Sequence, residues 1–394
     1  MLKLKNWAIF LLIIIAAGQG MGQKRAVIGY YQSWQWRKSP VLLSPRNIPY
    51  DKLTVINYSF FYPLESGEIV GMDPAADRYL LQGERDRSLP DIEPVGSIIE
   101  LAKRQGARVV LSIGGWDNSS NFPQVAADPQ KRAYFAHGCV QHIRHYGFDG
   151  IDVDWEFPGY VRHKGTSQDR QNFTLLLQTV RDSLQALGGK TGAQYLLSIS
   201  LPAAASHLVD LEVEKISAIS DYINIMTWDL FSPGGKISNH NSALYGPAEG
   251  DSARCLDGAF KLYHDAHSVP AGKINLGAAF YGYAYKQCSK IYGEHQGADT
   301  SLFQEKDGIP YAQIAEKRNL FKRFRDSKAQ APYLVSDSLN MLISLDDEES
   351  VALKADYVIQ NKAAGLIIWP LLGDRLPDGT TPLLDVIDKK LSGK

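Results

Sequence analysis

The sequence predicts an α/β fold, a (β/α)8 TIM barrel with a small α+β insertion between the seventh strand and the last helix and eighth strand. Three observations support this prediction. Short apolar segments of the kind that form buried parallel strands recur eight times along the chain. Segments with helical periodicity alternate with them, as in barrels. No Gly-rich phosphate loop follows the first strand, although doubly wound folds commonly have one.

The predicted strands are short, rich in β-forming residues and bounded by turn residues. They lie at 26–31, 53–61, 108–116, 151–156, 195–201, 222–229, 273–281 and 365–371. In a barrel, the functional residues sit at the carboxyl ends of the strands. We therefore expect the ends of these segments to meet around one site.

Helical segments lie between the strands, and the clearest begins at Asp128. Asp128 can cap the helix and Pro129 fits its first turn, while Gly147 ends it. Apolar residues recur at helical spacing between these two ends. The predicted helices are 129–146, 171–187, 253–266 and 349–361.

The interval after residue 283 is too long for a simple connection between a strand and a helix. Its first part, 293–308, is loop-like, 311–324 has helical spacing, and 332–345 is rich in strand-forming residues. We predict an α+β insertion over 284–334. The barrel then comprises 23–283 and 335–394.

The N-terminus has the pattern of a secretory signal peptide, which we place at 1–22. Lysines precede an apolar run and small residues follow it. The run is shorter than the ~20 residues that span a bilayer, although an uncleaved anchor is the alternative. We expect a secreted, monomeric protein, extracellular or periplasmic, that is not held in a membrane after cleavage.

The composition excludes some partners. The chain has 394 residues and a formal net charge of −1, which gives no reason to expect nucleic acid or an anionic membrane as partner. Its cysteines, Cys139, Cys255 and Cys288, match no zinc-site spacing. An exported chain can oxidise one pair, and the pairing of Cys255 with Cys288 stays open. Cys139 is interpreted as a buried free thiol.

An acidic strand is the strongest functional signal. Asp152, Asp154 and Glu156 are two residues apart, so their side chains share one face of a strand, and the intervening residues are apolar. Like charges this close raise at least one pKa. A carboxyl group that stays protonated near neutral pH can act as a general acid.

This strand has two other interpretations. A solvated edge strand disagrees with its strongly apolar second face. A calcium or magnesium site is also possible in principle, but Gly150 precedes the acidic run, so the EF-hand pattern is absent. The sequence signals no specific metal site.

Several motifs together resemble family 18 glycoside hydrolases, the chitinases, over essentially the whole mature chain. The run 149–156 resembles their active-site signature, and Ser112 to Trp116 resembles a second signature on the third strand. Further similarities are at 27–31, 226–229, 280–282 and Trp369. The insertion is similar to a domain that deepens the substrate cleft in one subgroup.

The resemblance implies a retaining hydrolysis of β-1,4 bonds in chitin, without a cofactor. Glu156 would protonate the leaving oxygen and later act as base. The substrate's 2-acetamido group would be the nucleophile, because this family is an exception to the two-carboxylate scheme. Asp154 would orient that group, and Asp152 would share a proton with Asp154. Ser112 would support Asp152, and Asp149 would be structural.

The resemblance also implies a set of substrate-binding residues. Trp369 would form the floor beneath the distorted sugar, and Met226 and Asp229 would form the acetamido pocket. Other cleft-lining residues are Tyr30, Phe60, Trp116, Trp228 and Tyr281. His240 is expected only to form hydrogen bonds within a loop.

Two positions depart from the family pattern. Trp228 stands where a tyrosine usually donates a hydrogen bond to the acetamido carbonyl, and an indole can donate but not accept. Losing one preorganised donor costs about 10²–10³ in rate. Tyr283 stands where an arginine is common, which would alter the neighbouring subsite.

Other functions share these motifs. A non-catalytic chitin-binding lectin usually lacks the acidic Glu, which is present here as Glu156. An endo-β-N-acetylglucosaminidase acting on N-glycans shares the acidic motif, although the insertion and the cleft aromatics favour a linear polymer. A metal-dependent hydrolase is a more distant alternative.

Overall fold

The computed structural model describes residues 25–303, 305 and 308–392, and the predicted signal peptide lies outside these ranges. Eight parallel strands form the barrel and neighbour one another in chain order. β1 pairs with both β2 and β14, which closes the barrel. The strands are β1 (Ala26–Gln32), β2 (Val55–Pro63), β4 (Arg108–Gly114), β5 (Gly150–Asp154), β6 (Leu196–Pro202), β7 (Tyr222–Met226), β8 (Ile274–Ala279) and β14 (Gly365–Trp369). The predicted fold class is confirmed.

Five strands end two or three residues before their predicted ends, β4 and β14 among them. β5 ends at Asp154, so Glu156 lies in the loop that follows. β7 ends at Met226 because the chain leaves the extended conformation by Asp229, which has φ of 53°. β8 ends at Ala279. Tyr281 belongs instead to an antiparallel strand of a second sheet.

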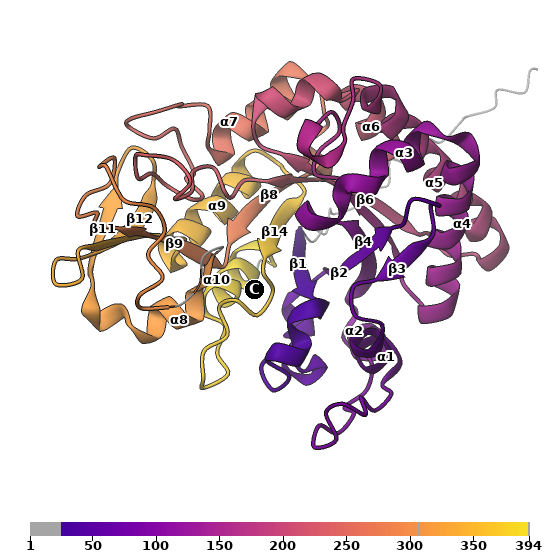
Figure 1. The fold of residues 1–394 in the computed structure, drawn as a ribbon, viewed down its shortest axis with the longest axis horizontal. Coiled ribbons are helices and arrows are strands. Elements are labelled where there is room, and N and C mark those ends of the chain that lie inside the picture. The colour runs from indigo at the N-terminus through magenta and orange to yellow at the C-terminus, as the bar shows by residue number, and fades with distance from the viewer. Residues whose placement is uncertain (1–24, 304, 306–307, 393–394) are drawn as a thin grey trace, which may run out of the picture.

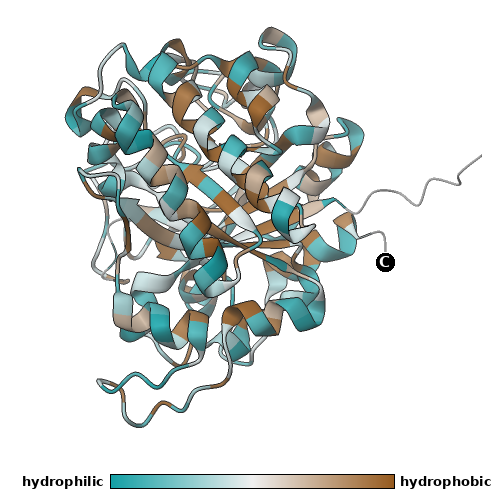
Figure 2. Ribbon diagram, turned by 90° about the vertical axis from the view of Figure 1, so that its right-hand side faces the viewer, coloured by the Kyte–Doolittle hydropathy of each residue, from teal (hydrophilic) through white to brown (hydrophobic). Residues whose placement is uncertain are grey.

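The helices surround the barrel and turn their apolar sides toward it (Figures 1 and 2). In α4 (Pro129–Tyr146), Asp128 caps the first turn by accepting from the backbone N–H groups of Gln130 and Lys131 at 2.7 and 3.1 Å. Gly147 ends this helix with φ of 88°. The bounds predicted for α4 are therefore confirmed.

The remaining helices include several that the sequence analysis did not predict. The predicted segment 253–266 is a short α-helix followed by a π-helical turn over 262–266. The others are α1 (Pro74–Gln82), α2 (Ile98–Gln105), α3 (Phe122–Ala127), α5 (Asp169–Thr191), α6 (Val213–Ile219), α7 (Leu256–Lys261), α9 (Glu348–Gln360) and α10 (Pro382–Leu391). An additional strand, β3 (Ile69–Gly71), forms a hairpin with β2.

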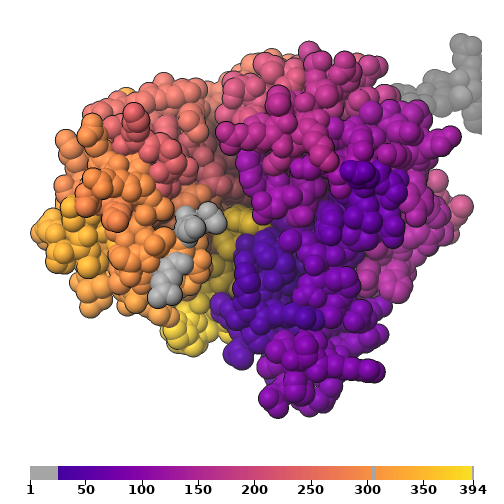
Figure 3. Space-filling model, in the orientation of Figure 1, coloured from indigo at the N-terminus to yellow at the C-terminus, as the bar shows by residue number. Residues whose placement is uncertain are grey.

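A five-stranded sheet stands beside the barrel, at the left in Figure 1. Its strands are β9 (Tyr281–Lys286), β10 (Ile309–Pro310), β11 (Lys322–Asp326), β12 (Ala331–Ser336) and β13 (Met341–Ser344), in the order β10-β9-β13-β12-β11. α8 (Tyr311–Glu316) accompanies it. In Figure 3 the surface is hollowed between this insertion and the part of the barrel that holds β1 and β2.

The predicted bounds of the insertion, 284–334, need correction. The sheet runs from Tyr281 to Ser344, and the boundary at 334 falls inside β12. Within the insertion, the predicted helix over 311–324 is wrong beyond Glu316, where α8 ends. The end of that segment belongs to β11, which lies at the edge of the sheet and pairs antiparallel with β12. The pairing with β12 overrides the helical spacing of its apolar residues.

Several smaller predictions have outcomes in the structure. The cysteines Cys139, Cys255 and Cys288 are free and buried, so the pairing left open is not formed. No helix in the described ranges is long and apolar enough to cross a membrane. His240 is buried in the loop after β7, and its Nε2 lies 3.3 Å from a carboxylate oxygen of Asp326 on β11.

Candidate active site

β5 carries the acidic cluster to the carboxyl end of the barrel. The alternation expected from the sequence holds around Trp155, whose ring stacks on Phe122 at 5.2 Å and meets Phe173 edge-on at 5.4 Å. Trp155 is 1% exposed, so these contacts bury it against the helical layer. Asp152, Asp154 and Glu156 alternate with it and therefore lie on the opposite side of the chain.

Asp152 is completely buried and is held by neutral donors. Ser112 Oγ donates to Oδ2 at 2.8 Å, and Ser198 Oγ donates to Oδ1 at 2.5 Å. Asn224 and Tyr30 add longer bonds of 3.2 and 3.3 Å. Burial raises the pKa of Asp152, and these donors pull it back. Ser112 therefore contacts Asp152 as predicted, whereas Ser198 and Asn224 were not identified from the sequence.

Asp154 is also buried, but it has fewer hydrogen-bond donors around it than Asp152. Its Oδ1 has no hydrogen-bond partner among the described residues. Burial raises the pKa of Asp154 well above its ordinary value, and the charges of Glu156 and Asp152 raise it further. The Asp154 carboxyl therefore keeps hydrogen-bonding capacity that the protein does not use.

Glu156 follows in the loop and is half-buried. Burial, together with the charges of Asp229 and Asp117, raises its pKa to about 8. Its backbone is fixed at both ends: its N–H donates to Ser119 Oγ at 2.9 Å, and its carbonyl accepts from His163 Nδ1 at 2.6 Å. A glutamic acid with this pKa stays protonated at neutral pH, as a general acid requires.

Asp229 completes the charged part of the site. Its Oδ1 accepts the hydroxyls of Tyr281 and Tyr283, each at 2.5 Å. Its backbone N–H donates to Asn241 Oδ1 at 2.8 Å. Burial raises the pKa of Asp229, and the two phenols lower it. The departure at Tyr283 thus brings a neutral donor to a carboxylate that lies close to Glu156.

Four aromatic rings gather at the ends of β1, β2 and β14. The Trp369 ring lies 5.9 Å from both Tyr30 and Phe60, and it is nearly parallel to Phe60, with 24° between the planes. Trp34 stacks on Phe60 at 5.4 Å and lies 6.1 Å from Trp369. Trp34 was missed by the sequence analysis, although its place just after the first strand was a usable signal.

Trp116 forms a second aromatic surface next to Glu156. Its side chain is 48% exposed. Three rings from the loop after β5 surround it: His163 at 4.8 Å, Tyr160 at 5.4 Å and Phe157 at 6.4 Å. An exposed indole held in a fixed orientation is suited to stack on a sugar.

Trp228 and Met226 occupy the end of β7. Trp228 is 8% exposed and packs in one cluster with Tyr30 and Tyr281, and Met226 packs against this cluster. A Cβ atom added at Gly277 would lie 2.6 Å from the Trp228 ring, so the glycine makes room for the indole. The barrel accommodates the residue that departs from the family pattern.

Asp149 is the predicted site residue that lies apart from the others. It precedes β5, and its Oδ2 accepts the backbone N–H of Val109 at 2.8 Å, near the amino end of β4. Asp149 therefore lies away from the acidic cluster, and its structural role stays a prediction.

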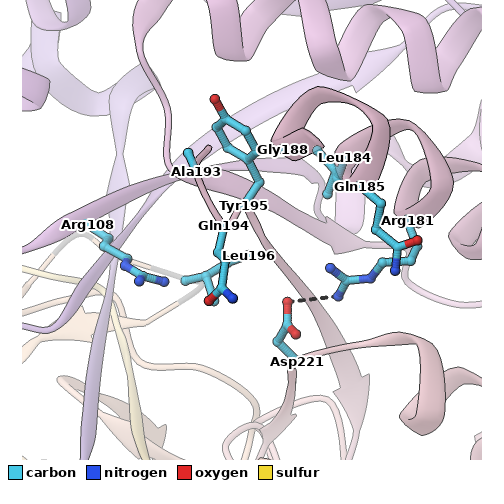
Figure 4. Close-up of a pocket in the computed structure, with 10 residues that line it drawn as sticks. All are labelled: Arg108, Arg181, Leu184, Gln185, Gly188, Ala193, Gln194, Tyr195, Leu196 and Asp221. Carbon is cyan, nitrogen blue, oxygen red and sulfur yellow. Dashed lines mark hydrogen bonds and ion pairs between the residues drawn. The ribbon is translucent and has the colours of Figure 1, made fainter. Parts of the chain in front are cut away.

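A cavity of about 390 Å³ lies at the opposite end of the barrel (Figure 4). Arg108, Leu196 and Asp221 line it, and they lie at the starts of β4, β6 and β7. Arg181 pairs with Asp221 at 2.8 Å. None of the acidic or aromatic site residues lines this cavity, so it is separate from the active site.

Among the residues that the structure describes, no group of three or more His, Cys, Asp or Glu side chains is arranged to hold a metal ion. The carboxyl groups of the site are instead bound to hydroxyl and amide donors or left without a partner.

A barrel with a buried carboxyl cluster at the carboxyl ends of its strands, flanked by exposed and stacked aromatic rings, has the architecture of a glycoside hydrolase. The chain also matches the family model "Glycosyl hydrolases family 18" over residues 26–374. It belongs to this family, which confirms the resemblance found in the sequence.

Individual relatives agree with this assignment. The chain is 32% identical to Chitinase A1 of Niallia circulans, over 89% of this chain and 56% of that protein, so it spans about half of that relative's length. Its structure superposes on chitinase ChiA74 of Bacillus thuringiensis with a TM-score of 0.82 and 30% identity, covering 94% and 70% of the two chains. It also superposes on a family 18 N-acetylglucosaminidase of Paenibacillus barengoltzii with a TM-score of 0.76 and 28% identity, covering 93% of this chain and 99% of that chain.

Proposed function

We propose that this protein is a chitinase that hydrolyses β-1,4 bonds between N-acetylglucosamine units with retention of configuration. The observation that carries the proposal is the pairing of two carboxyl groups with different environments. Glu156 has a pKa of about 8, and the neighbouring Asp154 has a buried oxygen without a partner among the described residues. One group is suited to donate a proton, and the other to bind a substrate N–H.

In the proposed reaction Glu156 protonates the glycosidic oxygen as the bond to the anomeric carbon breaks. The carbonyl oxygen of the substrate's own 2-acetamido group attacks that carbon and forms an oxazolinium ion. Asp154 accepts the acetamido N–H and offsets the positive charge. Glu156 then removes a proton from water as the water oxygen attacks the anomeric carbon. The bond from that carbon to the acetamido oxygen breaks, and the β anomer is released.

In this scheme the Asp152 carboxylate stays ionised. Its donors support an ionised carboxylate, so a proton shared within the cluster can move to Asp154. The stacked rings around Trp369 serve as the floor for the distorted sugar, and Met226, Trp228 and Asp229 surround its acetamido group. Trp116 receives the sugar on the leaving-group side.

The relatives support a chitin-type substrate, since two of them are chitinases. We further propose that the protein is secreted and acts as a monomer. One relative is named an N-acetylglucosaminidase, which makes single-sugar release a second candidate. Product size distinguishes the two activities.

The test is a time course on chitotetraose and chitohexaose with wild-type protein and Glu156→Gln. Wild type should release chito-oligosaccharides, and the variant should lose about 10²–10⁴ of the rate. Proton NMR of fresh product should show the β anomer first. Chitin binding without turnover by the wild type would identify a lectin instead, and N-glycan release without chitotetraose cleavage would identify an endo-β-N-acetylglucosaminidase.

A further inference from the structure

A buried carboxylate binds both ends of the loop that follows the acidic strand. Asp169, at the start of α5, accepts the backbone N–H groups of Gly159 and Thr166, both at 3.0 Å. Asp169 is 1% exposed. The residues between these two contacts, including His163, are therefore held at a fixed place next to Glu156.

His163 makes two contacts that no other described residue combines. Its Nδ1 must donate to the Glu156 carbonyl, at 2.6 Å, because a carbonyl oxygen can only accept. Its ring meets the Trp116 indole edge-on, with 4.8 Å between centroids and 67° between planes. The same side chain thus touches the backbone of the acid and the exposed aromatic surface.

Trp116 and Glu156 are also joined on a second side. Trp116 and Ser119 belong to one 3-10 turn, 116–121, and Ser119 Oγ accepts the Glu156 N–H at 2.9 Å. The two peptide groups that flank the Glu156 Cα are therefore fixed from different loops. The peptide group before the Cα is fixed by Ser119, in the turn that carries Trp116. The peptide group after it is fixed by His163, whose ring contacts Trp116.

We infer that His163 is a positioning residue that sets the distance and orientation between Trp116 and Glu156, and thereby places the leaving-group sugar on the acid. The inference rests on the proposed function, in which Glu156 is the acid and Trp116 receives that sugar. It follows that His163 matters when the leaving group has a ring to stack, and matters much less when it has none.

Two substitutions separate the two contacts. His163→Asn keeps an N–H donor near the Glu156 carbonyl but loses the ring beside Trp116. His163→Phe keeps the ring but loses the donor. His264 provides matched controls away from the site, because its Nδ1 donates to the Val269 carbonyl at 2.8 Å and its ring lies 5.2 Å from that of Phe260.

The substrates are chitotetraose, which places sugar on the leaving-group side, and β-chitobiosyl fluoride, whose leaving group has no ring. For His163→Asn we expect KM for chitotetraose to rise about tenfold, equivalent to about 1.4 kcal/mol. For His163→Phe we expect kcat to fall with KM nearly unchanged. Both variants should keep fluoride release within about twofold of wild type, and the corresponding His264 variants should leave all parameters unchanged.

A purely structural role would lower the rates on both substrates equally, in step with the loss of thermal stability. That result, or wild-type kcat and KM in both His163 variants, would overturn the inference. If either variant is poorly folded, the double variant Trp116→Ala/His163→Asn decides. Its KM should equal that of Trp116→Ala alone, because the ring contact is already gone.

Failure of the proposed function has a different signature. Wild-type protein that cleaves neither substrate would contradict the chitinase assignment, and calorimetric titration with chitotetraose would then test His163. Weaker binding by His163→Asn than by wild type would support the positioning role, and equal binding would overturn it.

Discussion

The Tyr283 hydroxyl donates to Asp229 Oδ1 at 2.5 Å, and no lysine or arginine among the described residues forms an ion pair with this carboxylate. An arginine at position 283 would cancel the charge of Asp229. A phenol stabilises the carboxylate but leaves its charge in place. The Asp229 charge then adds to burial in raising the pKa of Glu156 to about 8.

Tyr283→Phe should therefore move the alkaline limb of the kcat/KM profile to lower pH, by up to about one unit. Removing one donor raises the pKa of Asp229, so less negative charge faces Glu156 and its proton is lost earlier. Initial rates on chitotetraose between pH 5 and 10 measure this shift. Tyr285→Phe is the matched control, since its hydroxyl donates to the Asn239 carbonyl instead. An unmoved limb in Tyr283→Phe would contradict the argument.

Asp154→Asn should stabilise the protein while reducing turnover. Because its pKa is raised on folding, the native state binds a proton that the unfolded chain releases above about pH 4, and the free energy of unfolding falls as the pH rises from there. The amide removes this dependence, with a gain of about 1–3 kcal/mol that is largest at alkaline pH. Urea unfolding at pH 5 and pH 8 tests it, with the exposed Asp182→Asn as control. Equal stability of variant and wild type at pH 8 would be the contrary result.

Trp228→Tyr should favour hydrolysis over transfer to a second sugar. A phenol can donate to the acetamido carbonyl, and one such donor contributes up to about 10²–10³ in rate. The smaller ring also leaves space beside Gly277, so some stability should be lost. Product ratios at high chitotetraose concentration measure the change. If both hydrolysis and transfer stay at wild-type levels, the indole already serves as the donor.

Lys354→Met should strongly destabilise the fold. Lys354 Nζ binds Asp346 Oδ2 at 2.5 Å and Ser242 Oγ at 2.6 Å, and both charged side chains are fully buried. Removing the ammonium leaves the carboxylate unpaired, at a cost of about 3–5 kcal/mol.

Denaturant unfolding measures this cost, and the double variant Lys354→Met/Asp346→Asn should recover part of it. The exposed pair Lys390–Asp356 gives the control, since Lys390→Met should cost less than about 1 kcal/mol. A small loss in Lys354→Met, similar to that of Lys390→Met, would show that the buried pair is not needed for stability.

Local patterns were enough to predict the barrel and the position of the acidic cluster. The alternation around Trp155 and the cap at Asp128 depend on neighbours in the chain, so they can be identified in the sequence. The contacts of Asp152 could not be predicted in the same way. Ser198 and Asn224 come from β6 and β7, and nothing near them in the sequence indicates which carboxylate they face.

The errors have the same physical origin. The 311–324 segment has helical spacing, but pairing with β12 makes its end a strand. Tyr281 was expected at the end of a barrel strand, yet it opens the second sheet and pairs with Pro310. In both cases a distant strand determines the local structure, and single-sequence periodicity contains no information about that partner.

The position of β9 affects how the insertion can be exchanged between related proteins. The strand begins only two residues after β8, and its first and third residues are the phenols bound to Asp229. Exchanging the insertion with that of a relative at this junction would also exchange two of the hydroxyl donors that act on the carboxylate in the candidate active site. Chimaeras intended to change only cleft depth should therefore be joined after Tyr283, so that the recipient keeps its own pH dependence.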